Sequence, residues 1–234
     1  MELGPEEVDL WLAPLDCSPT TSLALIKTLS ADEVERADSF HFAHDRTRFI
    51  ARRGILRDLL SKYLGCAPVE IRFAYQSRGK PQLEQTERTT GDLRFNLSHS
   101  VTAALYAFSW GKEVGVDIEL IRPGIPWERV ASRFFTASEI AELQQWPAHQ
   151  RMTGFLTCWT RKEAYLKVRG EGLSIPLDSF EVSAAPCEAP MLLVAPELSE
   201  PERWSLCDVP LGQCLAGALA TEGRPVRLRL FTYC

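Results

Sequence analysis

The sequence predicts an α+β fold made of two similar halves, each with a small, mainly antiparallel sheet and one long helix. Two segments, 45–64 and 150–168, have helical patterns that end at a glycine. A strand pattern precedes each segment and further strand patterns follow it, although the residues themselves show no repeat. We therefore predict an N-terminal half of residues 1–110 and a C-terminal half of residues 111–234.

The N-terminal half begins with an alternating strand pattern at residues 7–13. Ser30 then has the character of a helix N-cap, with Glu33 three residues on as the partner of a capping box. In the segment 45–64, apolar residues recur at spacings of seven, four and three, which predicts a long helix that ends at Gly65.

Three arginines of this long helix lie at or beside its apolar face. At about 100° per residue, Arg48 and Arg52 project toward the core side, and Arg53 lies at its border. Two interpretations remain open: the arginines extend past the core to pair with nearby acids, or they line an anion pocket at its edge.

Further strands follow at 71–75 and 101–110, the second preceded by the run FNLSHS at 95–100. A turn at Gly111 and Lys112 leads into a strand at 114–120, so we expect the strands 101–110 and 114–120 to pair as a hairpin. That pairing would place His99 in one sheet with the acids of the second strand.

The C-terminal half continues with a helical region over 127–146, in which Thr136 to Glu139 marks a second helix start. The long helix 150–168 follows and is closed by Gly170 and Gly172. Strands separated by proline-rich turns fill 173–234, with 227–233 as the last.

Composition excludes several classes of protein. A net charge of −5 argues against general nucleic-acid binding, which needs a basic face. Seven scattered cysteines, with no C-x-x-C pair, indicate neither a disulfide framework nor a zinc site. The acidic N-terminus is unlike a signal peptide, and no apolar run is long enough to span a membrane. We expect a cytoplasmic protein.

Two short strings carry the chemistry. In VGVDIEL (114–120), Asp117 and Glu119 project from one face of the predicted strand. In WTRKEAYLK (159–167), Glu163 and Lys167 lie one helical turn apart, and Lys162 is adjacent. Three carboxylates with two lysines suggest Mg²⁺ holding a phosphate, because Mg²⁺ prefers oxygen ligands. Taken singly, each string also fits a solvated surface.

Ser98 and His99 precede this strand. They are adjacent in sequence and lack the G-x-S-x-G turn of serine hydrolases, so we do not expect that class. A lone histidine is more often structural than catalytic, but near phosphates its imidazole is a suitable donor.

Together these motifs resemble a known family. VGVD and WTRKEAYLK, some forty residues apart, look like the paired signature of the 4′-phosphopantetheinyl transferases. The length and the runs FNLSHS (95–100), RGKP (78–81) and GEGL (170–173) are similar to the large, Sfp-type subgroup, which is pseudo-dimeric. The resemblance spans residues 30–180 and implies two halves related by a pseudo-twofold axis, with the active site at their junction.

The resemblance implies transfer of the 4′-phosphopantetheine arm of coenzyme A to a serine of an apo carrier protein, with release of adenosine 3′,5′-bisphosphate. The acceptor would be an acyl, polyketide or peptidyl carrier, in fatty-acid, polyketide or nonribosomal-peptide synthesis. A monomer is the simplest expectation, without membrane or nucleic-acid partners. The alternatives are a non-catalytic relative that binds coenzyme A or a carrier, and an unrelated Mg²⁺-dependent phosphohydrolase.

By similarity, Asp117, Glu119 and Glu163 hold Mg²⁺, and either Glu163 or a metal-bound water accepts the serine proton. Lys167 stabilises or protonates the leaving group, so that Asp117, Glu163 and Lys167 form the catalytic set. The residues expected to contact coenzyme A are Arg36, Arg48, Arg53, Lys80, Ser98, His99, Lys162 and Lys167. The family pattern favours Arg53 where the helix projection favours Arg48 and Arg52. We expect the carrier to dock at the loop 84–92 or at the region 127–135.

Overall fold

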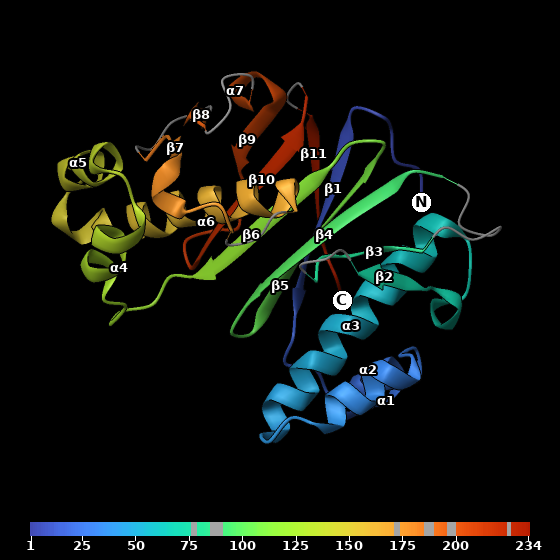
Figure 1. Cartoon of the computed structure of the whole chain (residues 1–234). Helices are drawn as coiled ribbons and strands as arrows, with labels where there is room; N and C mark the ends of the chain where they lie inside the picture. Colours follow the sequence, from blue (N-terminus) through green and yellow to red (C-terminus); the bar gives the residue numbers. More distant parts are fainter. Residues whose placement is uncertain (76–78, 85–90, 171–173, 185–189, 196–199, 224–225) are drawn as a thin grey trace.

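The protein consists of two sheets packed face to face, with a long helix on the outer side of each (Figure 1). The computed structural model describes residues 1–75, 79–84, 91–170, 174–184, 190–195, 200–223 and 226–234. Within these residues the predicted α+β fold class is confirmed. The turn expected at 77–81, the loop 84–92 and the run 170–173 fall wholly or partly outside them.

The first sheet has the strand order β11-β1-β5-β4, and the second has the order β6-β10-β9. Two small hairpins, β2-β3 and β7-β8, accompany them. The strands of the first sheet and its hairpin are β1 (Glu7–Pro14), β2 (Phe73–Tyr75), β3 (Pro81–Leu83), β4 (Leu93–Ser100), β5 (Ala103–Trp110) and β11 (Arg227–Thr232). The others are β6 (Val114–Leu120), β7 (Glu181–Val182), β8 (Leu192–Val194), β9 (Trp204–Asp208) and β10 (Leu215–Glu222).

The helices divide between the two ends of the molecule, as Figure 1 shows. The N-terminal half has α1 (Pro19–Ile26), α2 (Ala31–Asp38), α3 (Ala43–Leu64) and a short 3-10 turn, Pro68–Glu70. The C-terminal half has α4 (Trp127–Phe134), α5 (Ala137–Gln145), α6 (Arg151–Arg169) and α7 (Glu200–Arg203), with 3-10 turns at Ala148–Gln150 and Leu177–Ser179. Of these, α1 and the short α7 are the α-helices that the sequence pattern did not predict.

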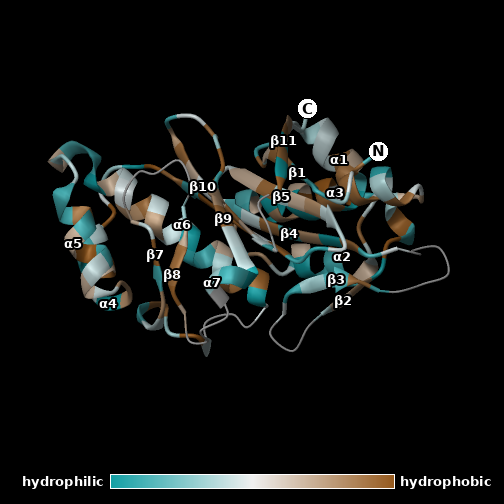
Figure 2. Cartoon of the chain, turned by 90° about the horizontal axis from the view of Figure 1, so that it is seen from above, coloured by the Kyte–Doolittle hydropathy of each residue, from teal (hydrophilic) through white to brown (hydrophobic). Residues whose placement is uncertain are grey.

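Three hydrophobic clusters hold these layers together. One joins α3 to the first sheet and another joins α6 to the second sheet. The third lies between the sheets and contains Leu10 and Leu105 on one side and Val116 and Ile118 on the other. Figure 2 shows the hydrophobic residues concentrated along the central strands. Because this third cluster buries apolar side chains of both sheets, it fixes the two halves against one another.

The same connectivity occurs in both halves. In each half a first strand, β1 or β6, is followed by a long helix, a small hairpin and two further sheet strands. The last of these, β5 or β10, pairs antiparallel with the other two strands. The predicted order of strand, helix and strands in each half is therefore observed. Both long helices end, as predicted, at a left-handed glycine, Gly65 (φ 67°) or Gly170 (φ 72°), a conformation that costs glycine little.

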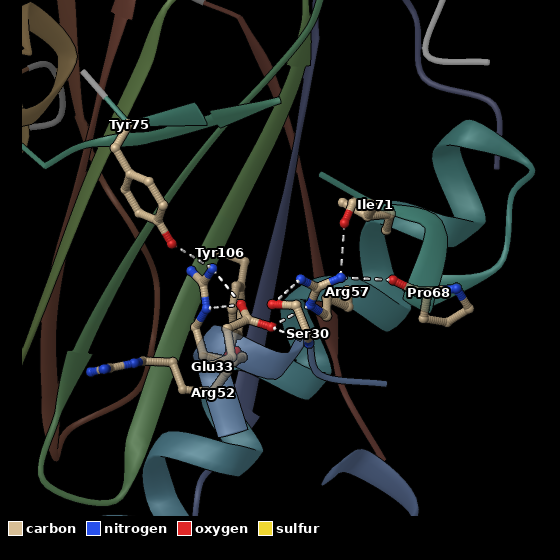
Figure 3. Close-up of polar contacts among 9 residues, drawn as sticks. Ser30, Glu33, Arg52, Arg57, Pro68, Ile71, Tyr75 and Tyr106 are labelled. Atoms are coloured by element: carbon tan, nitrogen blue, oxygen red, sulfur yellow. Dashed lines mark hydrogen bonds and ion pairs between the residues drawn. The ribbon is translucent and has the colours of Figure 1, made fainter. Parts of the chain in front are cut away.

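Both predicted capping boxes are present, and each glutamate also anchors a cation of the long helix. Glu33 caps the backbone of Ser30 and accepts from Arg57 Nε at 2.6 Å (Figure 3). In the other half, Glu139 caps Thr136 and binds Lys162 Nζ at 2.5 Å. These ion pairs are buried, so each ties a short helix to the core.

The one strand pairing that the sequence predicted is wrong, and the pairing of the last strand was not predicted. Strand β6 does not pair with β5, because β5 forms its hairpin with β4 through a turn at Val101, which has a positive φ of 49°. His99 and the acids of β6 therefore belong to different sheets. The last strand, β11, is not part of the C-terminal sheet: it pairs in parallel with β1.

Neither surface proposed for carrier docking gains support. The aromatic residues of the region 127–135 pack into the core of the C-terminal half, where Phe135 is buried and stacks on Phe155. Most of the loop 84–92 lies outside the described residues. Among the described parts of the chain, six cysteines are free, and we find no helix with the length and apolar character needed to cross a membrane.

Candidate active site

Strand β6 lies unusually close to helix α6, and Gly115 makes this approach possible. A Cβ at this position would lie 2.3 Å from the carbonyl oxygen of Ala164 and 2.3 Å from the amide nitrogen of Val168. No side chain fits there without moving the helix backbone. The glycine of the VGVD run therefore places the acids of β6 beside Glu163 and Lys167 of α6.

Asp117, Ser98 and Lys167 form a connected group across the two halves. Lys167 Nζ donates to Asp117 Oδ1 at 2.7 Å and to Ser98 Oγ at 2.8 Å. Ser98 Oγ in turn donates to Asp117 Oδ1 at 2.7 Å. Ser98 comes from β4 of the N-terminal half, so both halves contribute to this group.

The other two acids lie within electrostatic reach of Asp117. Burial, followed by the charge of Asp117, raises the pKa of Glu163, while Lys167 lowers it in part. Burial likewise raises the pKa of Glu119, against a hydrogen bond from Ser100. Carboxylates that repel one another in a partly buried site favour a cation or a proton.

One oxygen of this group has no partner. Asp117 Oδ2 is buried and makes no hydrogen bond. A buried acceptor without a donor is costly, and a metal ion is one group that would satisfy it. Within the described ranges, no three His, Cys, Asp or Glu side chains are arranged closely enough to hold a metal on their own.

A pocket of about 480 Å³ opens beside these acids. Its wall combines cations with two aromatic rings, Phe49 and Tyr75. The cations and other polar groups that were predicted to contact coenzyme A and that line this pocket are Arg36, Arg53, Ser98, His99 and Lys167. Lys167 is thus shared between the pocket and the acids.

Arg52 also lines this pocket and contacts the imidazole Nε2 of His99. Burial, Arg52 and Lys167 together lower the pKa of His99 to about 4. The imidazole is therefore neutral near pH 7, while the cations around it keep the pocket positive. Arg52, favoured by the helix projection, and Arg53, favoured by the family pattern, both line this pocket.

Arg48 and Arg53, the other two α3 arginines that the sequence singled out, have acidic partners. Arg53 pairs with Glu33 at 2.5 Å, donates to the Tyr75 hydroxyl at 3.2 Å and stacks over Phe73. Although burial raises the pKa of Glu33, the charges of Arg53 and Arg57 outweigh it and hold that pKa low. Arg53 therefore lines the pocket with part of its charge already neutralised.

Arg48 lies in an adjoining pocket of about 290 Å³ and pairs with Asp16 at 2.7 Å. Phe49, Arg52 and His99 line both pockets, so the two pockets adjoin one another. The two interpretations of the helix arginines are therefore both realised: Arg48 and Arg53 pair with acids, and they also line a cationic pocket.

The two remaining lysines do not line the main pocket. Lys80 donates to the backbone carbonyl of Lys167 at 2.8 Å and lies 3.4 Å from Glu113, so it ties the end of α6 to the N-terminal half. Lys162 is fully buried and bound to Glu139 and the carbonyl of Phe180. The structure does not bring Lys162 to the site, and we leave it out of the proposed set.

Sequence reasoning missed Tyr75, Phe49 and Ser100. Ser100 lies two residues after Ser98, so both side chains leave the strand on the same face. Its hydroxyl donates to Glu119 Oε2 at 2.7 Å. The two-residue spacing was a usable signal, but the partner strand could not be identified from it.

Comparison with known proteins shows the family of this chain. The profile of the 4′-phosphopantetheinyl transferase superfamily matches residues 113–214, and the profile of the N-terminal region of a 4′-phosphopantetheinyl transferase matches residues 16–109. The 4′-phosphopantetheinyl transferase HetI of Nostoc sp. is 42% identical over 95% of this chain and 91% of its own length. The chain belongs to the 4′-phosphopantetheinyl transferase superfamily.

Other members of the superfamily are similar over shorter stretches. The transferase Sfp of Bacillus subtilis is 32% identical over 66% of this chain and 66% of its own. A holo-(acyl-carrier-protein) synthase of Bacillus anthracis, solved in complex with CoA (3′,5′-ADP), is 22% identical and has a TM-score of 0.39. It covers 48% of this chain and 96% of its own.

Proposed function

We propose that this transferase moves the 4′-phosphopantetheine arm of coenzyme A to a serine of an apo carrier protein, with Mg²⁺ bound by Asp117, Glu119 and Glu163. The observation that carries the proposal is the position of Lys167. Its amine belongs to the wall of the cationic pocket and also contacts Asp117. A diphosphate that extends from the pocket toward the acids would pass this amine.

The donor set fits Mg²⁺. All three proposed ligands are carboxylates, and Mg²⁺ takes oxygen ligands while keeping water and substrate phosphate oxygens. Asp117 Oδ2 is buried without a partner, which suits a ligand atom. When bound, the ion would neutralise the diphosphate and make it a better electrophile. Because phosphate and water complete its shell, the protein carboxylates need not enclose it.

Residues of this chain would then perform the remaining tasks. Glu163, next to Lys167 on α6, would accept the proton of the attacking serine hydroxyl, either directly or through a metal-bound water. Lys167 donates to the leaving phosphate oxygen and offsets its charge. Ser98 and His99 line the same pocket as Lys167 and would bind the nucleotide phosphates there.

The positive field for the nucleotide phosphates would come from Arg36, Arg52 and Arg53 in the main pocket and from Arg48 in the adjoining one. We propose that Lys80 acts mainly by holding the C-terminal end of α6, since its amine already bonds the carbonyl of Lys167. One chain supplies both walls of the site, so a monomer suffices, and the substrates would be met in the cytoplasm.

A direct test uses the purified protein with coenzyme A, Mg²⁺ and a panel of apo acyl, polyketide and peptidyl carriers. We expect the mass of at least one apo carrier to increase by one phosphopantetheine arm, attached to a serine of that carrier. Binding of coenzyme A without transfer to any carrier would instead support a non-catalytic relative. Free phosphopantetheine formed without a carrier would indicate a hydrolase.

A further inference from the structure

Strand β4 reaches strand β6 through side chains and not through a backbone ladder. The two strands lie against one another but belong to different sheets. Three β4 residues at two-residue spacing bridge them: Asn96, Ser98 and Ser100. Because alternate residues of a strand share a face, this spacing gives a continuous polar stripe between the halves.

The two ends of the stripe bond the β6 backbone. Asn96 Oδ1 accepts from the amide of Val116 at 2.9 Å. Ser100 Oγ accepts from the amide of Leu120 at 3.1 Å. The stripe therefore satisfies backbone amides at the edge of β6 and fixes the position of β6 relative to β4.

Unlike Asn96, Ser100 also bonds a side chain of β6. Its hydroxyl hydrogen goes to Glu119 Oε2 at 2.7 Å while its oxygen receives the Leu120 amide. Both bonds involve neighbouring residues of β6, so one hydroxyl holds the Glu119 carboxylate against its own strand. Glu119 is only partly buried, and without this bond its side chain has several rotamers to choose from.

We propose that Ser100 is a positioning residue that orients Glu119 for cation binding from the opposite half of the chain. The inference rests on the proposed function, because it takes Glu119 as a ligand. Hydrogen bonds to ligating carboxylates fix their orientation, and loss of such a partner commonly weakens metal binding by about 10- to 100-fold. We expect Ser100→Ala to fall near the lower end of that range, since Asp117 and Glu163 are unchanged.

The test measures cation binding without turnover. The midpoint of thermal unfolding is followed as Mg²⁺ or Mn²⁺ is added to the full chain. We expect the half-saturating cation concentration to rise about tenfold in Ser100→Ala and to return close to the wild-type value in Ser100→Thr, which keeps the hydroxyl. Ser205→Ala is the matched control, because Ser205 is a strand serine that bonds only a carbonyl, that of Gly223 at 2.6 Å.

A double-mutant cycle shows whether Ser100 acts through Glu119. In a Glu119→Gln background, Ser100→Ala should cause no further loss of cation binding. Full additivity of the two substitutions would overturn the proposal, as would a Ser100→Ala variant that binds the cation as tightly as Ser205→Ala. A wild-type protein that gains no stability from either cation would overturn it too.

Transfer assays separate this inference from the proposed function. At saturating coenzyme A, Ser100→Ala should need more Mg²⁺ for half-maximal rate while its KM for coenzyme A stays unchanged. A raised KM for coenzyme A alone would assign the stripe to the nucleotide and overturn the proposal. If the wild type binds the cation in a Ser100-dependent manner but transfers to no carrier, the positioning role stands and the proposed reaction fails.

Discussion

The two halves of this chain place the same kinds of residues on their long helices but use them differently. Counted back from the terminal glycine, position −7 is an acid in both, Asp58 in α3 and Glu163 in α6. Position −3 is a lysine in both, Lys62 and Lys167. Position −8 is the buried cation, Arg57 or Lys162, bound to the capping glutamate of its half.

The two halves differ in the strand that lies against the first strand of each sheet, β1 or β6, and that comes from the other half of the chain. In the N-terminal half it is β11, whose Arg229 binds both oxygens of the buried Asp9 at 2.6 and 2.9 Å. Tyr63 adds a third bond to Asp9 at 2.6 Å. In the C-terminal half it is β4, which binds Asp117 and Glu119 through the hydroxyls of Ser98 and Ser100.

A guanidinium completes the charge balance of one half, whereas hydroxyls leave the other half with excess negative charge. Asp9 is satisfied by the protein itself, and Asp117 keeps one oxygen without a partner. The comparison teaches that acids become a site where the fold supplies only part of their counter-charge: Lys167 binds one oxygen of Asp117 and the other oxygen has no partner. The predictions below follow from this contrast.

The largest effect is expected at Asp117. Asp117→Ala removes a proposed metal ligand, so the transfer rate should fall by about a thousandfold. Asp9→Ala, its counterpart on the first strand of the other half, should lower stability and leave the transfer rate near wild type. Rates measured with excess folded protein, checked by circular dichroism, decide this. Retention of full activity by Asp117→Ala would remove the distinction between the halves.

The next effect concerns stability. Arg229→Met leaves Asp9 buried without its counter-ion, and breaking such a pair costs about 3 kcal/mol. Because Asp9 is the source of that cost, Asp9→Asn in the same chain should restore most of the loss. Urea unfolding of the single and double variants measures this. Equal destabilisation of both would mean that Arg229 stabilises β11 by packing alone.

A smaller effect should appear in the pH dependence, because β4 carries a titratable histidine and β11 carries none. The folded-state pKa of His99 is about 4, below the usual value of 6.5, so the unfolded chain binds a proton more readily. The contribution of His99 to stability is thus complete above pH 6.5 and is lost as pH falls toward 4. His99→Gln should flatten this decline in urea unfolding series, whereas His149→Gln, at an exposed position, should not.

The smallest effect is expected at Lys62. It forms an exposed i,i+4 pair with Asp58 at 2.9 Å, which contributes only about 0.5 kcal/mol. Lys62→Met should therefore change stability little and transfer not at all, whereas Lys167→Met should slow transfer strongly. Thermal unfolding and single-turnover transfer of both variants make the comparison. A slow Lys62→Met enzyme would show that the N-terminal half also takes part in the chemistry.

Local signals in the sequence predicted much of this molecule. The capping boxes at Ser30 and Thr136 and the left-handed Gly65 and Gly170 depend on residues within one helical turn, and all are where the pattern placed them. The pairing of Glu163 and Lys167 on one face of α6 is also a local consequence of helix geometry, although their proposed roles still await experiment.

What could not be predicted depends on distant partners. Lys162 is next to Glu163 in sequence but faces the core, where Glu139, 23 residues away, binds it. The β4-β5 turn at Val101 has neither glycine nor asparagine to signal it. The parallel pairing of β11 with β1 joins the two ends of the chain, and no local pattern in either strand identifies the other.

That pairing has a consequence for the order of events during synthesis. Asp9 leaves the ribosome 220 residues before Arg229 does. Until the final strand emerges, the sheet of the N-terminal half lacks an edge strand and Asp9 lacks its counter-ion. The half whose strands are made earlier is therefore completed later, because its sheet can close only after β11 has been synthesised.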